Sequence, residues 1–280
     1  MQNLNSIGRL SIGTAQQIPN YGIYNTSNKT NKLVDLKQIL SFASEEGISC
    51  IDTANSYSEA EINLSKCNLD IFDITTKINY HTQEYNIREL VYNSLSKLNL
   101  TSIYGILLHD TSILSLENKA EIAREIKTLK DEKIIKNFGI SIYGPNEYFR
   151  IKDMAHFDIV QIPFNVFDNR AIRSGLLEEL NNNGVEVQAR SIFLQGSLLN
   201  NHRNLPTKLR KFKQNFIDWE NWLLENKFSP LQACLSYVAR ISEISKLIIG
   251  IENLEQLKMI CEHFKKNHIK VPDTFSVDNE

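Results

Sequence analysis

Apolar and polar residues follow two rhythms along this chain, one helical and one extended. Between residues 31 and 46 the apolar side chains recur every three or four positions, as on one face of a helix, and Gly47 supplies the stop. The next four residues, Ile-Ser-Cys-Ile at 48–51, read as a short buried strand that ends before Asp52. A helix followed by such a strand is the unit that the rest of the chain repeats.

The repeats predict the fold. Short apolar runs predict strands at 10–13, 48–51, 72–76, 104–108, 137–141, 159–162, 185–189 and 246–249. Helical spacing predicts helices at 31–46, 60–64, 87–98, 122–129, 145–154, 172–180, 230–240 and 254–264. Continuous apolar strands suit a parallel sheet that is covered by helices. Eight such units predict a (β/α)8 TIM barrel, formed by residues 1–280 as one domain.

One segment interrupts the repeat. Residues 194–228 form an insertion after the seventh strand, with helical patterns at 206–212 and 215–226. In a barrel this insertion is expected to overhang the mouth, and the tail at 267–280 to lie over the surface. A doubly wound open sheet is the alternative fold, but it calls for a Gly-x-Gly-x-x-Gly turn after an early strand, which the chain lacks.

Composition narrows the class of protein. The 280 residues carry a formal charge of -2, so nothing favours nucleic acid or an acidic membrane surface as a partner. The start of the chain has no secretory pattern, and no apolar segment approaches the ~20 residues of a bilayer span, so a cytoplasmic protein is expected. The four cysteines lack metal-binding spacing, and we expect no metal site.

Four side chains with acid–base chemistry fall near successive strand ends. Asp52, Lys77 and His109 follow the second, third and fourth predicted strands, and Tyr57 lies in the loop after Asp52. Each of them alone has an ordinary structural explanation, such as a turn cap or a packed ring. Barrel active sites lie at the carboxyl ends of the strands, however, so a barrel would bring all four together.

The four groups suit the protonation of a carbonyl oxygen. A free phenol has a pKa of about 10, and a neighbouring ammonium would lower the pKa of Tyr57 by on the order of 1–3 units. Asp52 would keep Lys77 charged, and His109 would orient the carbonyl group. Because none of these groups supplies hydride, a cofactor must.

These motifs resemble the aldo-keto reductase family over nearly the whole chain. The matching segments are Gly13-Thr14-Ala15, residues 47–54, Tyr57, the strand ending in Lys77, residues 107–109, residues 136–141, Gln161 and residues 248–250. The resemblance implies an NAD(P)H-dependent carbonyl reductase in which Tyr57 donates the proton, Lys77 and Asp52 tune it, and His109 orients the carbonyl. The cofactor is expected to be NADP(H) or NAD(H), with NADPH slightly favoured.

The resemblance also implies a cofactor site across the barrel mouth. Its expected residues are Gly13, Thr14, Ser141, Gln161, Arg190, Ser191, Gly250, Asn253 and Gln256. Ser141 and Gln161 would hold the nicotinamide carboxamide. Gly250 and Asn253 lead into the last helix, whose free amides suit a phosphate, although Asn253 would cap that helix in any case.

Three positions depart from the family pattern. Ser58 replaces the glycine that often follows the tyrosine. Arg190 stands where relatives often stack an aromatic ring on nicotinamide, and a guanidinium can stack on a planar ring or pair with substrate instead. Gln256 stands where NADPH-preferring relatives often place Arg, with Glu252 close by, which weakens the case for NADPH.

The substrate is expected under the insertion. The candidate substrate residues are Tyr21, Phe193 and Trp219, although aromatic residues on amphipathic helices are more often part of the core. The segment Arg190-Ser-Ile-Phe-Leu-Gln-Gly196 resembles reductases of bacterial surface-polysaccharide biosynthesis, so a sugar carbonyl is the expected substrate.

Two other functions stay open at this point. The chain would be a redox-sensing subunit if it bound the dinucleotide without turnover, though such a protein has no need of the complete acid–base set. It would be a barrel lyase or isomerase if Lys77 formed a Schiff base with a carbonyl substrate.

Overall fold

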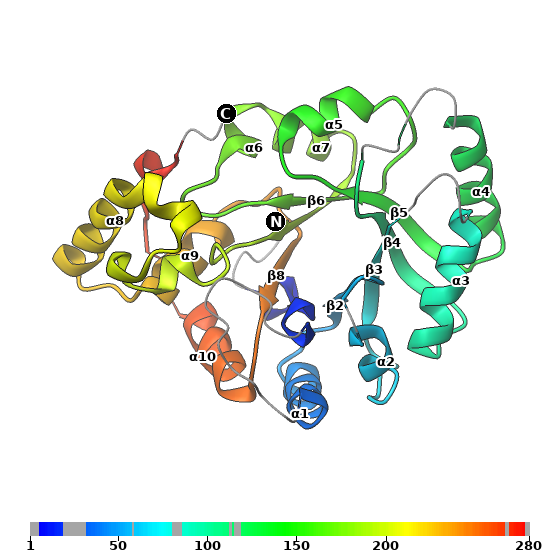
Figure 1. Ribbon diagram of the computed structural model, residues 1–280, viewed down its shortest axis with the longest axis horizontal. Coiled ribbons are helices and arrows are strands. Elements are labelled where there is room, and N and C mark those ends of the chain that lie inside the picture. Colours follow the sequence, from blue (N-terminus) through cyan, green and yellow to red (C-terminus); the bar gives the residue numbers. More distant parts are fainter. Residues whose placement is uncertain are drawn as a thin grey trace.

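The computed structural model describes residues 6–18, 32–57, 59–79, 86–111, 114, 119–266 and 269–277, and within them eight parallel strands close into a barrel (Figure 1). The strands are β1 (Leu10–Gly13), β2 (Cys50–Asp52), β3 (Asp73–Ile78), β4 (Ile103–Leu108), β5 (Ile135–Ser141), β6 (Ile159–Pro163), β7 (Glu186–Arg190) and β8 (Lys246–Gly250). Each strand pairs with its neighbour in chain order, and β1 pairs with β8 to close the ring. The predicted (β/α)8 barrel is confirmed.

Helices surround the strands (Figure 1). They are α1 (Lys32–Glu45), α2 (Ala60–Leu64), α3 (Ile87–Leu98), α4 (Lys119–Asp131), α5 (Pro145–Ile151), α6 (Arg170–Arg173), α7 (Leu176–Asn182), α8 (Lys213–Asn226), α9 (Pro230–Ala239) and α10 (Leu254–Lys265). Helix α3 illustrates how they attach, because its buried residues Ile87, Leu90, Val91, Leu95 and Leu98 form one apolar face. The core therefore lies between the strands and the inner helix faces.

Several boundaries differ from the sequence prediction. Strand β2 ends on Asp52, and β3 continues through Ile78, so that Lys77 lies inside its strand instead of after it. The helix predicted at 172–180 is two helices, because Gly175 adopts a left-handed φ of +74° between α6 and α7. The first helix predicted in the insertion is a 3-10 segment, Thr207–Phe212, that runs directly into α8.

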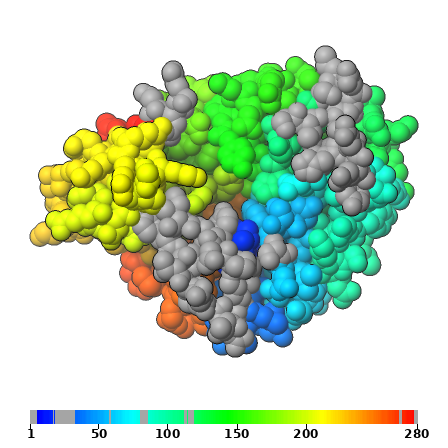
Figure 2. All heavy atoms as spheres, viewed as in Figure 1, coloured from blue at the N-terminus to red at the C-terminus, as the bar shows by residue number. Residues whose placement is uncertain are grey.

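The insertion forms one side of the molecule, seen in yellow in Figure 2. Its helix α8 buries Trp219, whose ring stacks on Trp222 at a centroid distance of 5.7 Å. The described part of the tail covers this pair, because Phe275 lies edge-on to Trp219 at 5.3 Å and the Val277 amide donates to the Phe167 carbonyl at 2.9 Å. The described part of the tail thus packs against the insertion, a contact that the sequence did not predict.

Candidate active site

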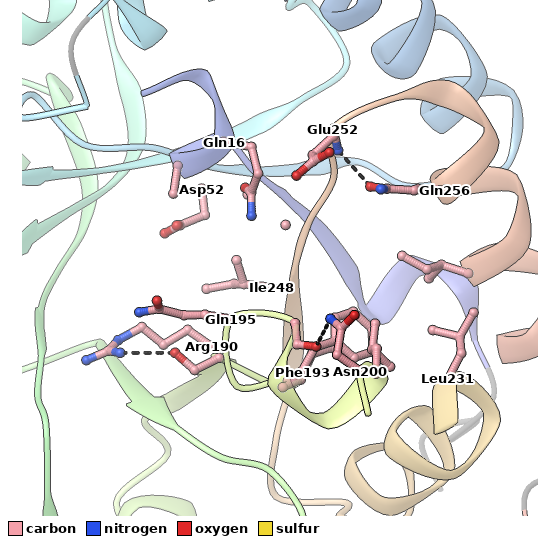
Figure 3. Close-up of a pocket in the computed structure, with 18 of the residues that line it drawn as sticks. Gln16, Asp52, Arg190, Phe193, Gln195, Asn200, Leu231, Ile248, Glu252 and Gln256 are labelled. Carbon is pink, nitrogen blue, oxygen red and sulfur yellow. Dashed lines mark hydrogen bonds between the residues drawn. The ribbon is translucent and has the colours of Figure 1, made fainter. Parts of the chain in front are cut away.

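A cavity of about 780 Å³ opens at the carboxyl ends of the strands (Figure 3). Its lining includes the last residue of five strands, namely Gly13, Asp52, Ser141, Arg190 and Gly250, together with Lys77 near the end of β3. This volume is in the range of cavities that hold cofactors and small ligands. The cavity therefore lies where a barrel concentrates its chemistry.

The base of the cavity holds a buried ion pair. The Lys77 Nζ lies 2.6 Å and 2.7 Å from the two carboxylate oxygens of Asp52, and it also donates to the Thr53 carbonyl at 3.0 Å. The Lys77 side chain is only 1% exposed. An ammonium placed there needs these oxygen partners, because burial removes its water.

The loop after β2 brings Tyr57 back over this pair. The Asn55 amide donates to the Lys77 carbonyl at 2.9 Å, and the Tyr57 amide closes a turn on the Ala54 carbonyl at 3.0 Å. The Lys77 Nζ consequently lies 5.2 Å from the centre of the Tyr57 ring. Two backbone hydrogen bonds thus position the phenol.

Burial raises the pKa of the Tyr57 phenol above its ordinary value, and the negative charge of Asp52 raises it further, while the charge of Arg190 acts in the opposite direction. The sequence-based expectation that Lys77 lowers this pKa is therefore wrong. The physical reason is that both Asp52 oxygens bind the ammonium and offset its charge. Tyr57 is held firmly in its protonated form.

His109 completes the group directly after β4. Its amide donates to the Ile78 carbonyl at 3.0 Å, its Nδ1 lies 3.4 Å from the Ser56 hydroxyl, and its ring is edge-on to Tyr57 at 6.0 Å. Burial first, and then the charge of Lys77, lower the pKa of His109 from 6.5 to about 4. The imidazole is therefore neutral near pH 7, with one N–H to donate.

Gln161 supports Asp52 from beneath the cavity. Its Nε2 donates to Asp52 Oδ1 at 2.8 Å, and its Oε1 accepts from the Ser141 hydroxyl at 3.3 Å. Gln161 is fully buried and does not line the cavity, whereas Ser141 does. The glutamine amide is thus a partner of the ion pair.

The start of α10 forms another wall. The Gln256 amide donates to Asn253 Oδ1 at 2.9 Å, and Gln256 Oε1 in turn accepts from the Glu252 amide at 2.9 Å (Figure 3). A Cβ on Gly250 would lie 2.1 Å from Gln16 Nε2, so the glutamine side chain crosses this glycine closely. Asn253 caps the helix, while Glu252 and Gln256 face the cavity.

The segment after β7 supplies the remaining wall. Ser191, Leu194 and Gln195 adopt left-handed φ values of 59°, 47° and 52°, which bend the chain tightly over the cavity. This bend places Phe193 in the lining. The part of the insertion that overhangs the mouth is therefore this bend and the residues up to Asn200.

The expected site residues divide into three groups. The residues that line the cavity are Gly13, Asp52, Tyr57, Lys77, His109, Ser141, Arg190, Ser191, Phe193, Gly250 and Gln256. Thr14, Gln161, Asn253 and Trp219 do not line it. Tyr21 and Ser58 lie outside the described residues.

The expectation that Trp219 forms a substrate wall is corrected by its position. Its side chain is 1% exposed, and its indole N–H donates to the Leu198 carbonyl at 3.2 Å. Thr14 is similarly turned inward, since its hydroxyl donates to Thr53 Oγ1 at 2.8 Å. Both side chains support the wall from behind.

Sequence reasoning missed several lining residues. They include Gln16, Tyr143, Leu199, Asn200, Leu231, Ile248, Met259 and His263. Gln16 and Tyr143 each lie within three residues of a strand end, and that proximity is the signal that was available for them. Leu231, Met259 and His263 lie on helices, so only the assembled barrel identifies them.

Two further findings concern the described ranges. None of their helices combines the length and apolar character needed to cross a lipid bilayer. They contain no cluster of three or more His, Cys, Asp and Glu side chains that could hold a metal ion.

Residues 9–272 match the model of the aldo/keto reductase family. A D-arabinose 1-dehydrogenase of Saccharomyces cerevisiae is 32% identical over 124 residues, which are 39% of this chain and 37% of that protein. The matched region therefore spans little more than a third of the yeast enzyme.

Solved structures share the fold. An aldo-keto reductase from Bacillus halodurans in its holo form superposes with a TM-score of 0.70 at 18% identity, covering 94% of this chain and 88% of that one. A second, from Pseudomonas aeruginosa, has a TM-score of 0.67 at 18% identity and covers 92% and 89%. At this identity the likeness concerns the barrel alone. The match across nearly the whole sequence is what shows that this chain belongs to the aldo/keto reductase family.

Proposed function

We propose that this protein reduces the carbonyl group of a small sugar-like compound, with a nicotinamide dinucleotide as cofactor and Tyr57 as general acid. One observation carries the proposal: Tyr57, His109 and the Lys77–Asp52 pair all face one cavity at the strand ends. Family membership supports the reaction type. The groups are complementary. Tyr57 can donate a proton, His109 can donate a hydrogen bond, and the Lys77–Asp52 pair holds two opposite charges in fixed positions beside them.

The residues present fit a dinucleotide. The lining runs from Ser141 and Arg190 on β5 and β7 to Gln256 and His263 on α10. On the way it crosses Gly13, where a Cβ would lie 3.0 Å from Ile248 Cγ2 and 3.2 Å from the Ile249 carbonyl oxygen. A larger side chain at this position would therefore crowd β8. When bound, the reduced cofactor supplies the hydride.

In the proposed mechanism the protein residues manage the carbonyl oxygen. The neutral imidazole of His109 donates a hydrogen bond that orients it. The Tyr57 hydroxyl gives up its proton as negative charge develops on that oxygen. The positive charges of Arg190 and of Lys77, whose Nζ lies 5.2 Å from the ring centre, favour the phenolate that remains. Asp52 holds the ammonium in place and offsets part of its charge.

We propose that NADH serves this protein at least as well as NADPH. Glu252 and Gln256 both line the α10 wall, and Gln256 offers an amide in place of a cation. A carboxylate beside a 2′-phosphate opposes its binding electrostatically, and the neutral amide of Gln256 adds no positive charge of its own. This local chemistry opposes the slight preference for NADPH that the family resemblance implies.

The sugar-like substrate rests on two observations. The yeast relative that matches part of the chain is named a D-arabinose 1-dehydrogenase. The mouth also carries several hydrogen-bonding side chains, including Ser141, Tyr143, Gln195 and Asn200, which suit a polyhydroxylated compound.

The geometry argues against Schiff-base chemistry at Lys77. Its ammonium is held by three oxygen atoms at 3.0 Å or less and is almost fully buried, so a free amine for attack on a carbonyl is disfavoured.

The test compares Tyr57→Phe with the wild type in a spectrophotometric assay of NADH and NADPH oxidation with D-arabinose, other aldoses and simple aldehydes. We expect Tyr57→Phe to lose about 10²- to 10⁴-fold in kcat while its cofactor Kd is unchanged. Tyr92→Phe on the exposed side of α3 is the matched control. A wild-type rate in Tyr57→Phe contradicts the general-acid role, and the absence of any carbonyl reduction by the wild type contradicts the function.

A further inference from the structure

Arg190 brings a guanidinium to the cavity wall without a described counter-ion. Its Nη2 donates to the Ile142 carbonyl at 3.0 Å and its Nη1 to the Ser191 hydroxyl at 3.4 Å, and its Cζ lies 4.8 Å from the centre of the Tyr143 ring. These partners are all neutral. Among the described residues no carboxylate forms an ion pair with Arg190.

Two other arginines of the molecule have a carboxylate partner. Arg170, in the helix that follows β6, pairs with Asp168 at 2.7 Å, and Arg88 on α3 pairs with Glu132 at 2.7 Å. The cation that shares the cavity with Arg190, Lys77, is fully matched by Asp52. The strand ends that line the cavity therefore carry one uncompensated positive charge, and it belongs to Arg190.

The guanidinium is preorganised for a ligand. A carbonyl, a hydroxyl and an aromatic face fix its plane, and two of its five N–H donors are used in the hydrogen bonds above. A planar guanidinium matches the two oxygens of a carboxylate or a phosphate. Because the side chain is already held, binding an anion costs little side-chain entropy.

Arg190 is also close to the reacting groups. It lines the same cavity as Tyr57 and His109. Its positive charge lowers the pKa of both groups, in agreement with that position. In the proposed reaction these two residues hold the carbonyl oxygen. An anion bound at Arg190 would then be carried on the same small molecule, near its carbonyl.

We propose that Arg190 binds an anionic group of the substrate, a carboxylate or a phosphate, and that the enzyme prefers acidic sugar-like carbonyl compounds over neutral ones. This inference rests on the proposed carbonyl reduction. A phosphate of the dinucleotide could bind the same guanidinium, and the experiment below distinguishes a substrate anion from a cofactor phosphate.

The experiment uses matched probes, glyceraldehyde with glyceraldehyde 3-phosphate and glucose with glucuronate. For the wild type we expect kcat/KM to be about tenfold to hundredfold higher for the anionic member of each pair, as for charge-assisted hydrogen bonds. Arg190→Gln should bring this ratio close to one, and Arg190→Lys should keep part of it. Arg124→Gln, an exposed change on α4, should leave the ratio as in the wild type.

Binding provides a readout that is independent of turnover. Calorimetric titration of glucuronate and glucose into the complex with oxidised cofactor should detect tighter binding of glucuronate, and Arg190→Gln should abolish the difference. An equal loss for neutral and anionic probes, or a raised cofactor Kd in Arg190→Gln, assigns the guanidinium to the cofactor and overturns the inference. A wild-type enzyme with no preference, in rate or in binding, overturns it as well.

The two hypotheses fail in different ways. If the wild type reduces the neutral aldehydes but shows no charge preference, only the role of Arg190 is wrong. If it reduces none of the probes yet binds glucuronate through Arg190, the anion site stands and carbonyl reduction fails.

Discussion

The Lys77 ammonium lies 2.6 Å and 2.7 Å from the two carboxylate oxygens of Asp52, under the ring of Tyr57. The two residues are 25 positions apart and come from the neighbouring strands β2 and β3. Gln161, from β6 and far along the sequence, donates a third hydrogen bond to the same carboxylate. The arrangement joins three strands at the point where the reaction is proposed to occur.

Removal of one charge from this pair should be costly. We expect Asp52→Asn to lower the free energy of unfolding by about 3–5 kcal/mol, because it leaves a buried ammonium without its counter-charge. Urea denaturation followed by circular dichroism measures the change. Asp131→Asn removes the acid of the exposed Lys127–Asp131 pair and should cost less than about 1 kcal/mol.

The double variant Asp52→Asn/Lys77→Met separates stability from function. It should recover part of the lost stability, because no charge remains buried, but it should not recover activity. If Asp52→Asn proves no less stable than Asp131→Asn, the pair does not have the structural importance assigned to it.

The pKa of His109 should appear in the pH dependence of stability. Its pKa falls from 6.5 to about 4 on folding, so between these values the unfolded chain binds more protons than the folded one. The free energy of unfolding must therefore decrease as the pH falls from about 6.5 towards 4. Relative to His109→Gln, the wild type should lose stability over this window.

Urea titrations of both proteins at several pH values between 4.5 and 7 measure this difference. His156→Gln is a suitable control, because the His156 side chain is 79% exposed. A stability difference between the wild type and His109→Gln that does not change with pH would mean that the folded protein does not depress this pKa.

The cavity wall at the start of α10 should determine whether NADPH or NADH binds more tightly. We expect Glu252→Gln/Gln256→Arg to tighten NADPH binding relative to NADH by about tenfold or more, because it removes a negative charge and adds a planar cation for the 2′-phosphate. Fluorescence titration with each dinucleotide measures both Kd values. Glu255→Gln, an exposed change in the same helical turn, is the control. An unchanged Kd ratio would place the 2′-phosphate elsewhere.

A series of side-chain hydrogen bonds inside the barrel should stabilise the fold without taking part in the reaction. Gln161 donates to Gln188 at 3.3 Å, Gln188 to Glu186 at 2.8 Å, and the Tyr104 hydroxyl to Glu186 at 2.5 Å. Tyr104→Phe removes a donor to a half-buried carboxylate and should lower the free energy of unfolding by about 1–3 kcal/mol.

The kcat of Tyr104→Phe should stay within about twofold of the wild type, since Gln161 keeps its bond to Asp52. Tyr92→Phe again provides the exposed comparison for stability. A large loss of kcat in Tyr104→Phe at unchanged stability would show that these hydrogen bonds affect the reaction itself.

The sequence by itself determined the succession of elements and the grouping of the chemistry. The sequence pattern shows which side chains are buried, for example through the helical spacing around Leu90 and Leu95 and the apolar run at residues 104–108. Every repeat of the barrel must bury one helix face and one strand, so this pattern recurs along the chain. The motif residues Asp52, Tyr57 and His109 could be assigned to one mouth because parallel strands end on the same side.

Only the tertiary structure decided which way those side chains face and what they meet. Lys77 lies inside its strand, and Gln161 turns beneath the floor instead of into the cavity, because strand register sets which neighbour a polar group reaches. The pKa of Tyr57 rises for the same kind of reason, since Asp52 offsets the ammonium and burial removes water from the phenol. The local sequence pattern encodes which side chains are buried. The hydrogen-bond partners and the protonation of those side chains depend on contacts between residues that are distant in the chain.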